Sequence, residues 1–583
     1  MLHTLTRSLR ENKGPALVTV LLSALEVVFE IVIPLFMSNL IDFGIEGGSM
    51  AAVWKFGAFL LLLAAFQLAT GVLAARIAAR ASVGFAANLR EDMYDNVQTF
   101  AFSNIDKFST ASIVTRLTTD TTNVQNAFQM LMRMAIRAPV MLVFSMVVSF
   151  RISRDISMTF LIILPILALA LFFIIRSVFP VFSRVFRTYD ELNNVVQENV
   201  RGIRVVKSFN QERHEIGKFG AISERIYQDF SKGERLITLN APLMQFCIYT
   251  CMIVISWLGA KAIIASGNDP ALGLTTGNLT ALITYTMQIL SSLMMLSMVF
   301  AMLTISLSSA RRIAEVLEER SDIPQPEQPV MTVRDGAVDF DHVSFVYASK
   351  ADKKVLDDID LHIRSGETIG IIGGTGASKS SLVQLIPRLY DVTGGKLTLG
   401  GVDVRDYDLD TLRGAVAMVL QKNELFSGTI AENLRWGNEN ATDEQLRHAC
   451  KLACADEFIS AMPDGYDTHI EQGGTNVSGG QKQRLCIARA LLKKPKVLIL
   501  DDSTSAVDTR TDAQIQQALS TYIPDTTKII IAQRISSVQN ADRIVVLDDG
   551  HIDAVGSHDE LLRTCEIYRE VYESQQKGGE DDA

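Results

Sequence analysis

Long apolar runs alternate with polar stretches in the first half of the chain. Six runs each hold about 20 mostly apolar residues, the length that an α-helix needs to cross the hydrocarbon core of a bilayer. They cover residues 16–41, 56–79, 128–150, 156–179, 238–266 and 279–307. One or two such runs could be buried helices of a large soluble protein, but six indicate a membrane domain.

The connections after the second and the fourth apolar runs are polar and nearly free of Pro and Gly. Each spans roughly 50 residues, so a helix pair built from one of them would project roughly 35 Å from the membrane. Lys and Arg gather in these connections and before the first run, which places the N-terminus and both connections in the cytoplasm. Arg151 and Arg154, in the short connection after the third run, go against this rule.

From about residue 335, β-rich runs such as TIGIIGG, AVAMVL, KVLILDD and KIIIAQ alternate with helical patterns. This alternation predicts a mixed α/β domain with a largely parallel sheet. The expected fold class is therefore an all-α six-helix transmembrane domain followed by an α/β phosphate-loop domain. We expect the transmembrane domain at 1–317, a Pro-rich linker at 318–334, the α/β domain at 335–575 and a disordered tail at 576–583.

Charge and cysteine content exclude several classes of function. The net charge of -10 argues against a nucleic-acid partner, which would favour a basic stripe. The six cysteines lie in apolar or helical stretches without C-x2-C pairs, so we assign them neither a metal nor a disulfide. The N-terminus has basic residues but no short apolar core with a cleavage site, and we expect it to be retained.

The segment GGTGASKSS, residues 373–381, lies between an apolar run and a helical pattern, as a phosphate-binding loop requires. Its glycines leave backbone N–H groups free to bind phosphates, Lys379 reaches the terminal phosphates, and Ser380 can ligate Mg²⁺. Ser378 stands where the pattern requires glycine. The candidate nucleotide-binding residues of this loop are Gly373, Gly374, Thr375, Gly376, Ala377, Ser378, Lys379, Ser380 and Ser381.

The segment KVLILDD supplies a second part of such a site. Its four apolar residues predict a buried strand that ends at Asp501, beside the phosphate loop. A carboxylate in that position suits Mg²⁺ or a water molecule bound to it.

A third segment, NVSGGQKQRLCIARALL at 476–492, precedes this strand by a short distance. It is nearly the LSGGQ signature of ATP-binding cassette proteins. With six apolar runs ahead of one such domain, the whole chain resembles an exporter-type half-transporter of that family. The matching signature residues are Val477, Ser478, Gly479, Gly480 and Gln481.

The resemblance implies roles for further residues. Tyr347 would stack on adenine, Gln421 would be the Q-loop residue, and Gln533 occupies the switch position. Ser380, Gln421 and Asp501 would hold Mg²⁺. The D-loop would comprise Ser505, Ala506, Val507 and Asp508.

In this family two cassettes close head to tail, so each ATP lies between the phosphate loop of one chain and the signature of the other. By the same resemblance, the ends of the two polar connections, SNIDKFSTAS and SFNQERHEIG, would make the coupling contacts.

Four positions depart from the family pattern. Asp502 stands in place of the catalytic glutamate, Gln533 in place of the switch histidine, Ser378 in place of a glycine and Gln472 in place of an acidic residue. The shorter side chain of Asp502 withdraws the carboxylate from the attacking water. Because the groups that bind ATP are retained, we expect a site that holds ATP and hydrolyses it poorly.

Four signature residues, Ser478, Gly479, Gly480 and Gln481, are by contrast intact. This asymmetry resembles heterodimeric bacterial exporters with one degenerate and one consensus site, so we expect a second, different half-transporter as partner. A homodimer with Asp502 as a weak base, and a regulatory ATP-binding subunit without productive transport, are the alternatives. The resemblance also implies a multi-pass protein of the bacterial plasma membrane with a cytoplasmic cassette.

The transported compound is less constrained by the sequence. Glu26 and Glu30 lie one turn apart in the first apolar run, where they would either attract cationic compounds or pair with Arg133 or Arg137. The last run is rich in methionine, which suits an adaptable apolar pocket but also serves merely to fill helix interfaces. We expect export of hydrophobic or amphipathic compounds, of the multidrug type, with a lipid or lipopeptide flippase as the alternative.

Overall fold

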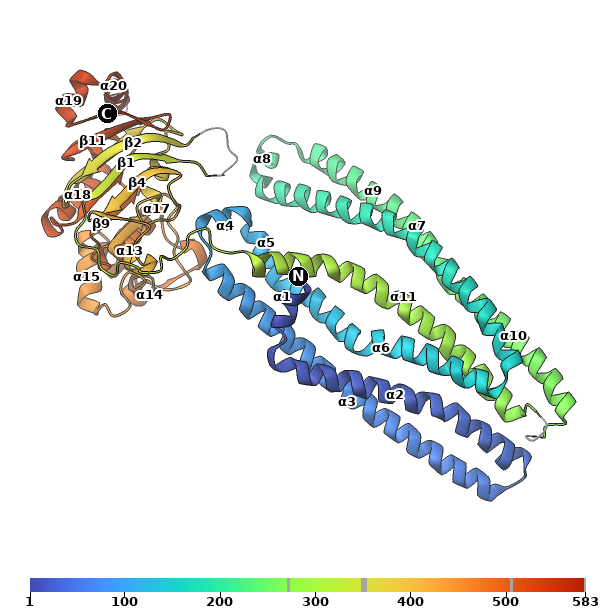
Figure 1. Cartoon of the computed structure of the whole chain (residues 1–583). Helices are drawn as coiled ribbons and strands as arrows, with labels where there is room; N and C mark the ends of the chain where they lie inside the picture. The colour runs from blue at the N-terminus through green and yellow to red at the C-terminus, as the bar shows by residue number, and fades with distance from the viewer. Residues whose placement is uncertain (270–272, 348–353, 504–506, 581–583) are drawn as a thin grey trace. The chain divides into compact units, whose positions relative to one another are not determined.

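The computed structural model describes residues 1–269, 273–347, 354–503 and 507–580. The chain forms two compact units (Figure 1). The first comprises Met1–Gln98 and Thr110–Glu319, and the second comprises Thr99–Ser109 and Arg320–Ala583.

Helices build the whole of the first unit. They are α1 (Leu2–Arg7), α2 (Lys13–Asn39), α3 (Met50–Gln98), α5 (Thr110–Thr115), α6 (Thr121–Ile152), α7 (Arg154–Arg201), α8 (Ile203–Ser208), α9 (Glu212–Thr238), α10 (Asn240–Ser266) and α11 (Thr276–Glu318), with short 3-10 and π turns at Arg10–Asn12, Leu40–Glu46 and Arg116–Asp120. Within the described residues, six helical segments are long and apolar enough to cross a membrane. Each contains one of the six predicted runs, so that prediction is confirmed.

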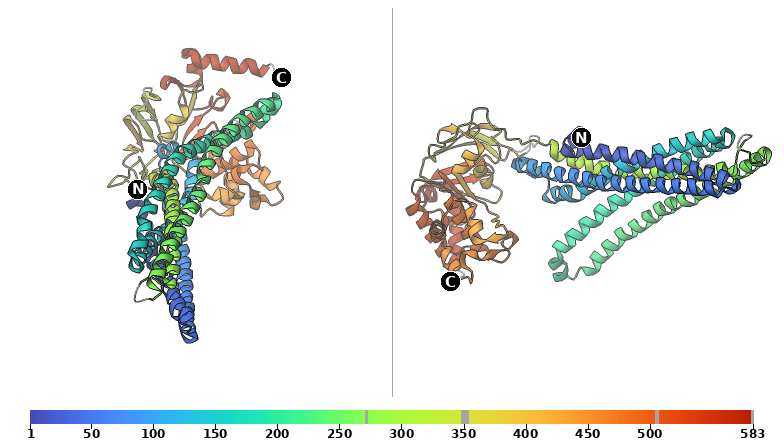
Figure 2. Two further views of the ribbon diagram at one scale, coloured as in Figure 1. Left: turned by 90° about the vertical axis from the view of Figure 1, so that its right-hand side faces the viewer. Right: turned by 90° about the horizontal axis from the view of Figure 1, so that it is seen from below.

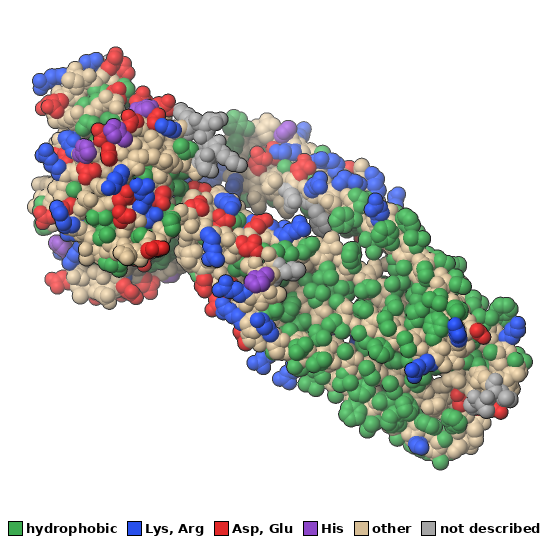
Figure 3. All heavy atoms as spheres, in the orientation of Figure 1, with side chains coloured by type: hydrophobic (Ala, Val, Ile, Leu, Met, Phe, Trp, Pro, Cys, Tyr) green, Lys and Arg blue, Asp and Glu red, His purple; other side chains and the backbone are tan. Residues whose placement is uncertain are grey.

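The two polar connections continue the spans as helices. Helix α3 runs unbroken through 49 residues and α7 through 48. Helices α2, α3, α6 and α11 pack together. Helix α7 packs on α9 and α10, and the part of α7 that extends beyond its apolar run lies apart from α2, α3, α6 and α11 (Figure 2). The apolar part of this unit is covered by hydrophobic side chains on the face that Figure 3 shows, as expected of a surface in contact with lipid tails.

A partly buried ion cluster joins α2 to α6. The Arg137 guanidinium donates through Nη1 to Glu26 Oε1 (2.8 Å) and through Nη2 to Glu30 Oε2 (2.7 Å). A carboxylate within a membrane is costly unless it is paired. Of the two alternatives that the sequence left open for these glutamates, the structure therefore shows pairing, and it shows it with Arg137.

The described residues of the second unit form three sheets. A six-stranded sheet has the order β12 (His551–Gly556), β11 (Arg543–Asp548), β3 (Thr368–Gly373), β10 (Thr527–Ile531), β9 (Val497–Asp501) and β6 (Val416–Val419). An antiparallel sheet has the order β2 (Leu356–Ile363), β1 (Val338–Phe345), β4 (Gly394–Leu399) and β5 (Val402–Asp403), and β7 (Gly428–Thr429) pairs with β8 (His469–Ile470).

Parallel pairing relates β11, β3, β10, β9 and β6, as the sequence predicts, and β12 runs antiparallel to β11. Helices of this unit are α4 (Phe102–Lys107), α12 (Lys379–Gln384), α13 (Leu409–Ala415), α14 (Ile430–Arg435), α15 (Asp443–Leu452), α16 (Asp456–Ser460), α17 (Gly479–Leu492), α18 (Thr509–Tyr522), α19 (His558–Thr564) and α20 (Glu566–Glu580). The α/β fold class of the second unit is confirmed.

Two boundaries differ from those expected from composition. Residues 99–109 belong to the second unit, although they lie inside the stretch 1–317. They contain α4, where Asp106 Oδ2 accepts a hydrogen bond from Tyr390 Oη (2.8 Å) and Phe102 stacks near the Tyr390 ring at 6.0 Å. Helix α20 extends to Glu580, into the stretch 576–583 expected to be a disordered tail.

Candidate nucleotide site

The strand order places the candidate residues at one edge of the six-stranded sheet. Strands β3, β10, β9 and β6 are neighbours and run in the same direction, so their carboxyl ends meet there. Gly373 ends β3 and Asp501 ends β9, while Gln533 and Gln421 each lie two residues beyond the ends of β10 and β6. Ligands of open α/β sheets bind at this edge.

The phosphate loop follows β3 and leads into α12. A Cβ on Gly374 or Gly376 would meet no atom within 4 Å, so the loop backbone is open to a ligand. Ala377 packs into the core, and its N–H donates to the Gly374 carbonyl oxygen (3.2 Å). The N–H groups of Thr375 and Gly376 make no backbone hydrogen bond within the described residues, which suits phosphate oxygens.

Ser378 adopts a left-handed backbone conformation, with φ of 67° and ψ of 22°. This conformation costs an L-residue with a Cβ roughly 1–2 kcal/mol, which gives a physical reason for the glycine that the phosphate-loop pattern requires here. The hydroxyl is 3.5 Å from the Gly376 carbonyl oxygen, at the limit of a hydrogen bond. Serine therefore leaves the loop geometry in place but strains it.

Lys379, Ser380 and Asp501 form one corner of the site, which we call the binding corner. Lys379 Nζ donates to the carbonyl oxygens of Gly373 and Gly374, both at 2.8 Å. Burial lowers the pKa of Lys379, and the carboxylates of Asp501 and Asp502 oppose that shift. Ser380 Oγ donates to Asp501 Oδ1 (3.1 Å), and burial raises the pKa of Asp501.

Asp502, Gln421 and Gln533 form a second group of side chains, which we call the water-side corner. Gln533 Nε2 donates to Asp502 Oδ2 at 2.7 Å, and Gln421 Nε2 lies 3.4 Å from the same oxygen. The Asp502 backbone has a positive φ of 49°, and its N–H donates to the Ile531 carbonyl oxygen (3.0 Å). Three sequence-predicted residues thus meet on one carboxylate oxygen.

Tyr347 lies beside the phosphate loop. Its Oη is 2.8 Å from Ser381 Oγ, and its ring contacts Phe345 and Tyr390 edge-on at 4.8 and 5.0 Å. The side chain is 45% exposed, so part of the ring is available for stacking.

The signature residues begin α17 on the surface of the second unit. Ser478 is the N-cap: its Oγ accepts from the Gln481 N–H (3.3 Å), and Gln481 Oε1 accepts from the Ser478 N–H (2.9 Å). In the described part of the chain no hydrogen bond joins residues 477–481 to residues 373–381. The exposed N-terminus of a 14-residue helix is well suited to a phosphate that another chain supplies.

Comparison with known proteins agrees with this geometry. Residues 16–294 match the family "ABC transporter transmembrane region", and residues 356–505 match the family "ABC transporter". The uncharacterized ABC transporter ATP-binding protein YfiB of Bacillus subtilis is 36% identical to this chain, and the alignment covers 96% of each. The chain belongs to the ABC transporter family.

Two further similarities extend over nearly the whole ABC transporter chain. The uncharacterized ABC transporter ATP-binding protein Rv1273c of Mycobacterium tuberculosis is 33% identical, over 99% of this chain and 98% of its own. A bacterial Atm1-family ABC exporter with ATP bound has the same fold, with a TM-score of 0.80 over 97% of this chain and 98% of that one, at 24% identity. This ABC transporter is thus a half-transporter, with one membrane domain fused to one ATP-binding cassette.

Part of the D-loop of this ABC transporter lies outside the described residues, namely Ser505 and Ala506. Val507 is buried, and Asp508 caps α18 by accepting from the Thr511 N–H (2.9 Å) and the Thr511 hydroxyl (2.8 Å). The backbone hydrogen bond from Thr511 lowers the pKa of Asp508. Gln472 is exposed in the turn Gln472–Gly474 before the signature.

Sequence reasoning missed one residue that acts on the site. Gln575 of α20 donates through Nε2 to the Gln533 carbonyl oxygen (2.7 Å) and accepts through Oε1 from the Ile535 N–H (2.9 Å). It therefore fixes the backbone on both sides of Arg534, directly after the switch position. No local pattern identifies Gln575, because its partners lie about 40 residues earlier in the chain.

The binding corner fits a magnesium ion. Mg²⁺ prefers oxygen ligands and is usually held by one or two side chains together with phosphate oxygens. The hydroxyl of Ser380 and the carboxylate of Asp501 supply two such oxygens on adjacent elements. When bound, the ion would neutralise phosphate charge.

Proposed function

We propose that this half-transporter pairs with a different half-transporter and exports hydrophobic or amphipathic compounds at the expense of ATP. Its own phosphate-loop site holds ATP and Mg²⁺ but hydrolyses ATP poorly, and its signature completes the consensus site of the partner. The observation that carries the proposal is the Asp502 carboxylate, one oxygen of which already accepts hydrogen bonds from Gln533 and Gln421.

The water-side corner lacks what hydrolysis requires. A general base needs a heavy-atom contact of about 2.6–3.2 Å with the water that it activates. The Asp502 side chain is one methylene shorter than glutamate, and two amide groups occupy its Oδ2. Gln533 also offers no imidazole to the γ-phosphate. In contrast, the site keeps the ammonium group of Lys379, which binds the terminal phosphates of ATP.

The intact signature supports a partner that uses it. The capping box of Ser478 and Gln481 leaves the N–H groups of Gly479 and Gly480 at the exposed start of α17 for a phosphate group. A partner with a catalytic glutamate would then own one complete site, built in part from this chain. We place Tyr347 on adenine, Asp508 in the D-loop contact between cassettes, and the cassette and the N-terminus in the cytoplasm of a bacterial cell.

Apolar cavities in the membrane domain support a hydrophobic cargo. A cavity of about 280 Å³ between α6, α7 and α11 is lined by apolar side chains, among them Met146, Phe160, Leu164 and Leu293. Next to it in sequence, Met294 and Met298 of α11 are 46% and 63% exposed. Flexible thioether side chains adapt to molecules of different shape. We therefore favour the multidrug class over a lipid flippase.

The experiment measures ATP binding and Mg-dependent ATP hydrolysis by the full chain alone, reconstituted in vesicles. We expect ATP to bind and to turn over slowly, because both sites of a self-assembled dimer would carry Asp502 and Gln533. Lys379→Ala serves as the control that weakens ATP binding.

Rapid hydrolysis by the chain alone, lost on Lys379→Ala, would contradict the proposal and favour a homodimer with Asp502 as the base. Passive flux of solutes gated by ATP, without uptake of dye against a gradient by inside-out vesicles that contain both subunits, would favour a regulatory or channel-like assembly.

A further inference from the structure

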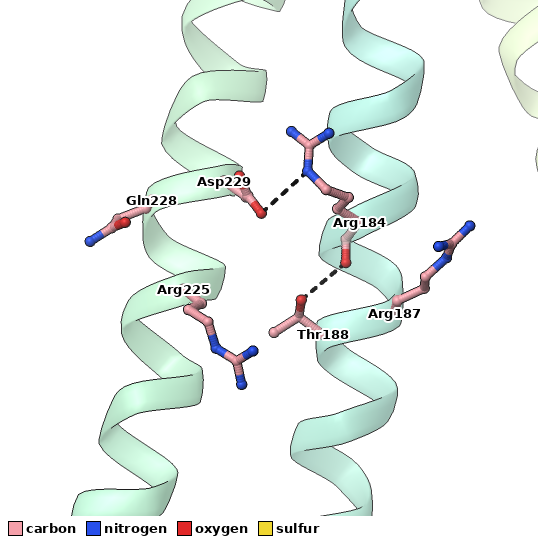
Figure 4. A pocket seen from close by; sticks show the side chains of 6 residues that line it. All are labelled: Arg184, Arg187, Thr188, Arg225, Gln228 and Asp229. Atoms are coloured by element: carbon pink, nitrogen blue, oxygen red, sulfur yellow. Dashed lines mark hydrogen bonds and ion pairs between the residues drawn. The ribbon is translucent and has the colours of Figure 1, made fainter.

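A second cavity lies between α7 and α9, in the helical extensions of the first unit. It measures about 340 Å³ and is lined by Arg184, Arg187, Thr188, Arg225, Gln228 and Asp229. In Figure 4, Arg184, Thr188, Arg225 and Asp229 lie along the space between the two helices, while Arg187 and Gln228 lie at its margins. The proposed function uses none of these residues.

The arginines of this cavity are only loosely neutralised. Arg184 Nε lies 3.7 Å from Asp229 Oδ2, beyond ordinary hydrogen-bond distance. Arg225 pairs with Glu191 at 2.8 Å, but both side chains are about half exposed, and such pairs contribute little and exchange readily. Arg187 is exposed and forms no ion pair with any residue that the structure describes. Three arginines against one aspartate line a cavity in a protein whose net charge is -10.

The cavity lies just beyond the apolar part of α7. Arg184 is five residues after Phe179, the last aromatic residue of the apolar run, and so about 7.5 Å along the helix. Phe182 and Phe230 meet edge-to-face between the helices, with ring centroids 5.6 Å apart. Phe179 is 60% exposed. Arg184 therefore lies at the depth of lipid headgroups when the apolar run spans the membrane, and Figure 3 shows Lys and Arg side chains at the edge of the hydrophobic surface.

We propose that this cavity binds the phosphate group of an anionic phospholipid from the adjoining leaflet. Guanidinium groups bind phosphate oxygens through paired N–H donors, and Arg184 and Arg225 approach the cavity from opposite helices. Basic pockets between transmembrane helices on the cytoplasmic side are suited to such headgroups. The lipid phosphate would replace the loose contact between Arg184 and Asp229. By binding arginines of both helices, it would connect α7 to α9. The proposal needs only the membrane domain and is independent of the partner subunit.

The test compares the full chain with Arg184→Gln/Arg225→Gln after purification from vesicles of phosphatidylcholine and phosphatidylglycerol. The readout is phosphatidylglycerol retained per chain after detergent washing. We expect the parent to retain it and the double variant to bind it about tenfold more weakly. The matched control, Arg201→Gln/Arg204→Gln, removes two exposed arginines at the far end of the same helical hairpin and keeps parental retention.

Equal retention by the parent and the cavity variant would overturn the proposal, as would an equal loss in the control variant, which would indicate charge attraction without a site. Thermal unfolding of the parent provides a second measurement that needs no variant. Phosphatidylglycerol should raise the unfolding temperature, whereas phosphatidylcholine should not. Equal stabilisation by inorganic phosphate would assign the cavity to a soluble anion and contradict the lipid.

Discussion

The binding corner and the water-side corner lie on neighbouring strands of one sheet, yet they differ in what they retain. In the binding corner, Lys379, Ser380 and Asp501 have the partners expected of a nucleotide site. In the water-side corner, Gln533 Nε2 donates a hydrogen bond to Asp502 Oδ2 (2.7 Å). Under the proposed function, ATP binding and ATP hydrolysis depend on separate groups of residues in one cassette, so that one can change while the other persists.

The largest expected effect comes from restoring the water-side corner. The double variant Asp502→Glu/Gln533→His restores a glutamate of the usual length as the general base and an imidazole that can contact the γ-phosphate. We expect the rate of ATP hydrolysis by the full chain to rise about a hundredfold, the lower end of what a positioned general base contributes. Steady-state Mg-ATPase measurements on both proteins check this.

Adding Lys379→Ala to the restored chain should abolish the gain. An unchanged rate in the restored chain would show that the water-side corner does not limit hydrolysis, and the contrast between the two corners would then fail.

The next effect concerns the binding corner alone. Lys379→Ala removes a charge-assisted contact to the phosphates, so we expect the dissociation constant for ATP to rise about thirtyfold. Equilibrium binding of a fluorescent ATP analogue measures it. Lys451→Ala, at an exposed position of α15, is the control and should leave the affinity unchanged. Equal weakening in both variants would indicate a general charge effect.

A smaller effect is expected at Ser378. Ser378→Gly removes the Cβ from a left-handed backbone position, so the free energy of unfolding of the cassette should rise by about 1 kcal/mol. Trp436 is the only tryptophan of the cassette, and its fluorescence reports cassette unfolding in a Trp54→Phe/Trp257→Phe background.

Ser378→Ala is the matched control, since it keeps the Cβ and removes only the hydroxyl. Stabilisation by alanine as large as that by glycine would exclude backbone strain as the cause.

The smallest effect is expected from Gln575→Ala in the restored chain. Gln575 is a positioning residue that holds the backbone at Gln533 and Ile535, so its loss should lower the maximal rate about threefold and leave ATP affinity unchanged. Gln576, whose Nε2 donates to Tyr572 Oη (2.6 Å), provides the control variant Gln576→Ala. A change in affinity rather than rate would assign Gln575 to general stability.

Much of the fold could be predicted because its signals are local. Twenty apolar residues specify a membrane-spanning helix wherever they occur, and a glycine-rich turn between a strand and a helix specifies a phosphate loop. The antiparallel sheet was not predicted, because β2 carries Asp357, Asp358 and Asp360, a residue type depleted in strands. The strand is stable because its other residues, such as Ile359 and Leu361, are buried against the neighbouring strand β1.

The candidate site likewise has one part that the local sequence predicts and one part that it does not. Sequence order along β3 and β9 predicts the meeting of Lys379, Ser380 and Asp501. It does not predict that Gln533 satisfies Asp502, nor that Gln575 holds the switch segment, because these contacts depend on side-chain conformation and on residues far apart in sequence.

The position of α4 has a practical consequence for recombinant protein. A cassette expressed from residue 320 onward would lack Phe102 and Asp106, and Tyr390 would lose both its ring neighbour and its hydrogen-bond acceptor. Tyr390 would then lie uncovered beside Tyr347, whose exposed ring it contacts edge-on at 5.0 Å. Exposed patches of this kind favour aggregation. Crystallisation or screening of the soluble part would therefore benefit from supplying residues 99–109 as a peptide or a fused segment.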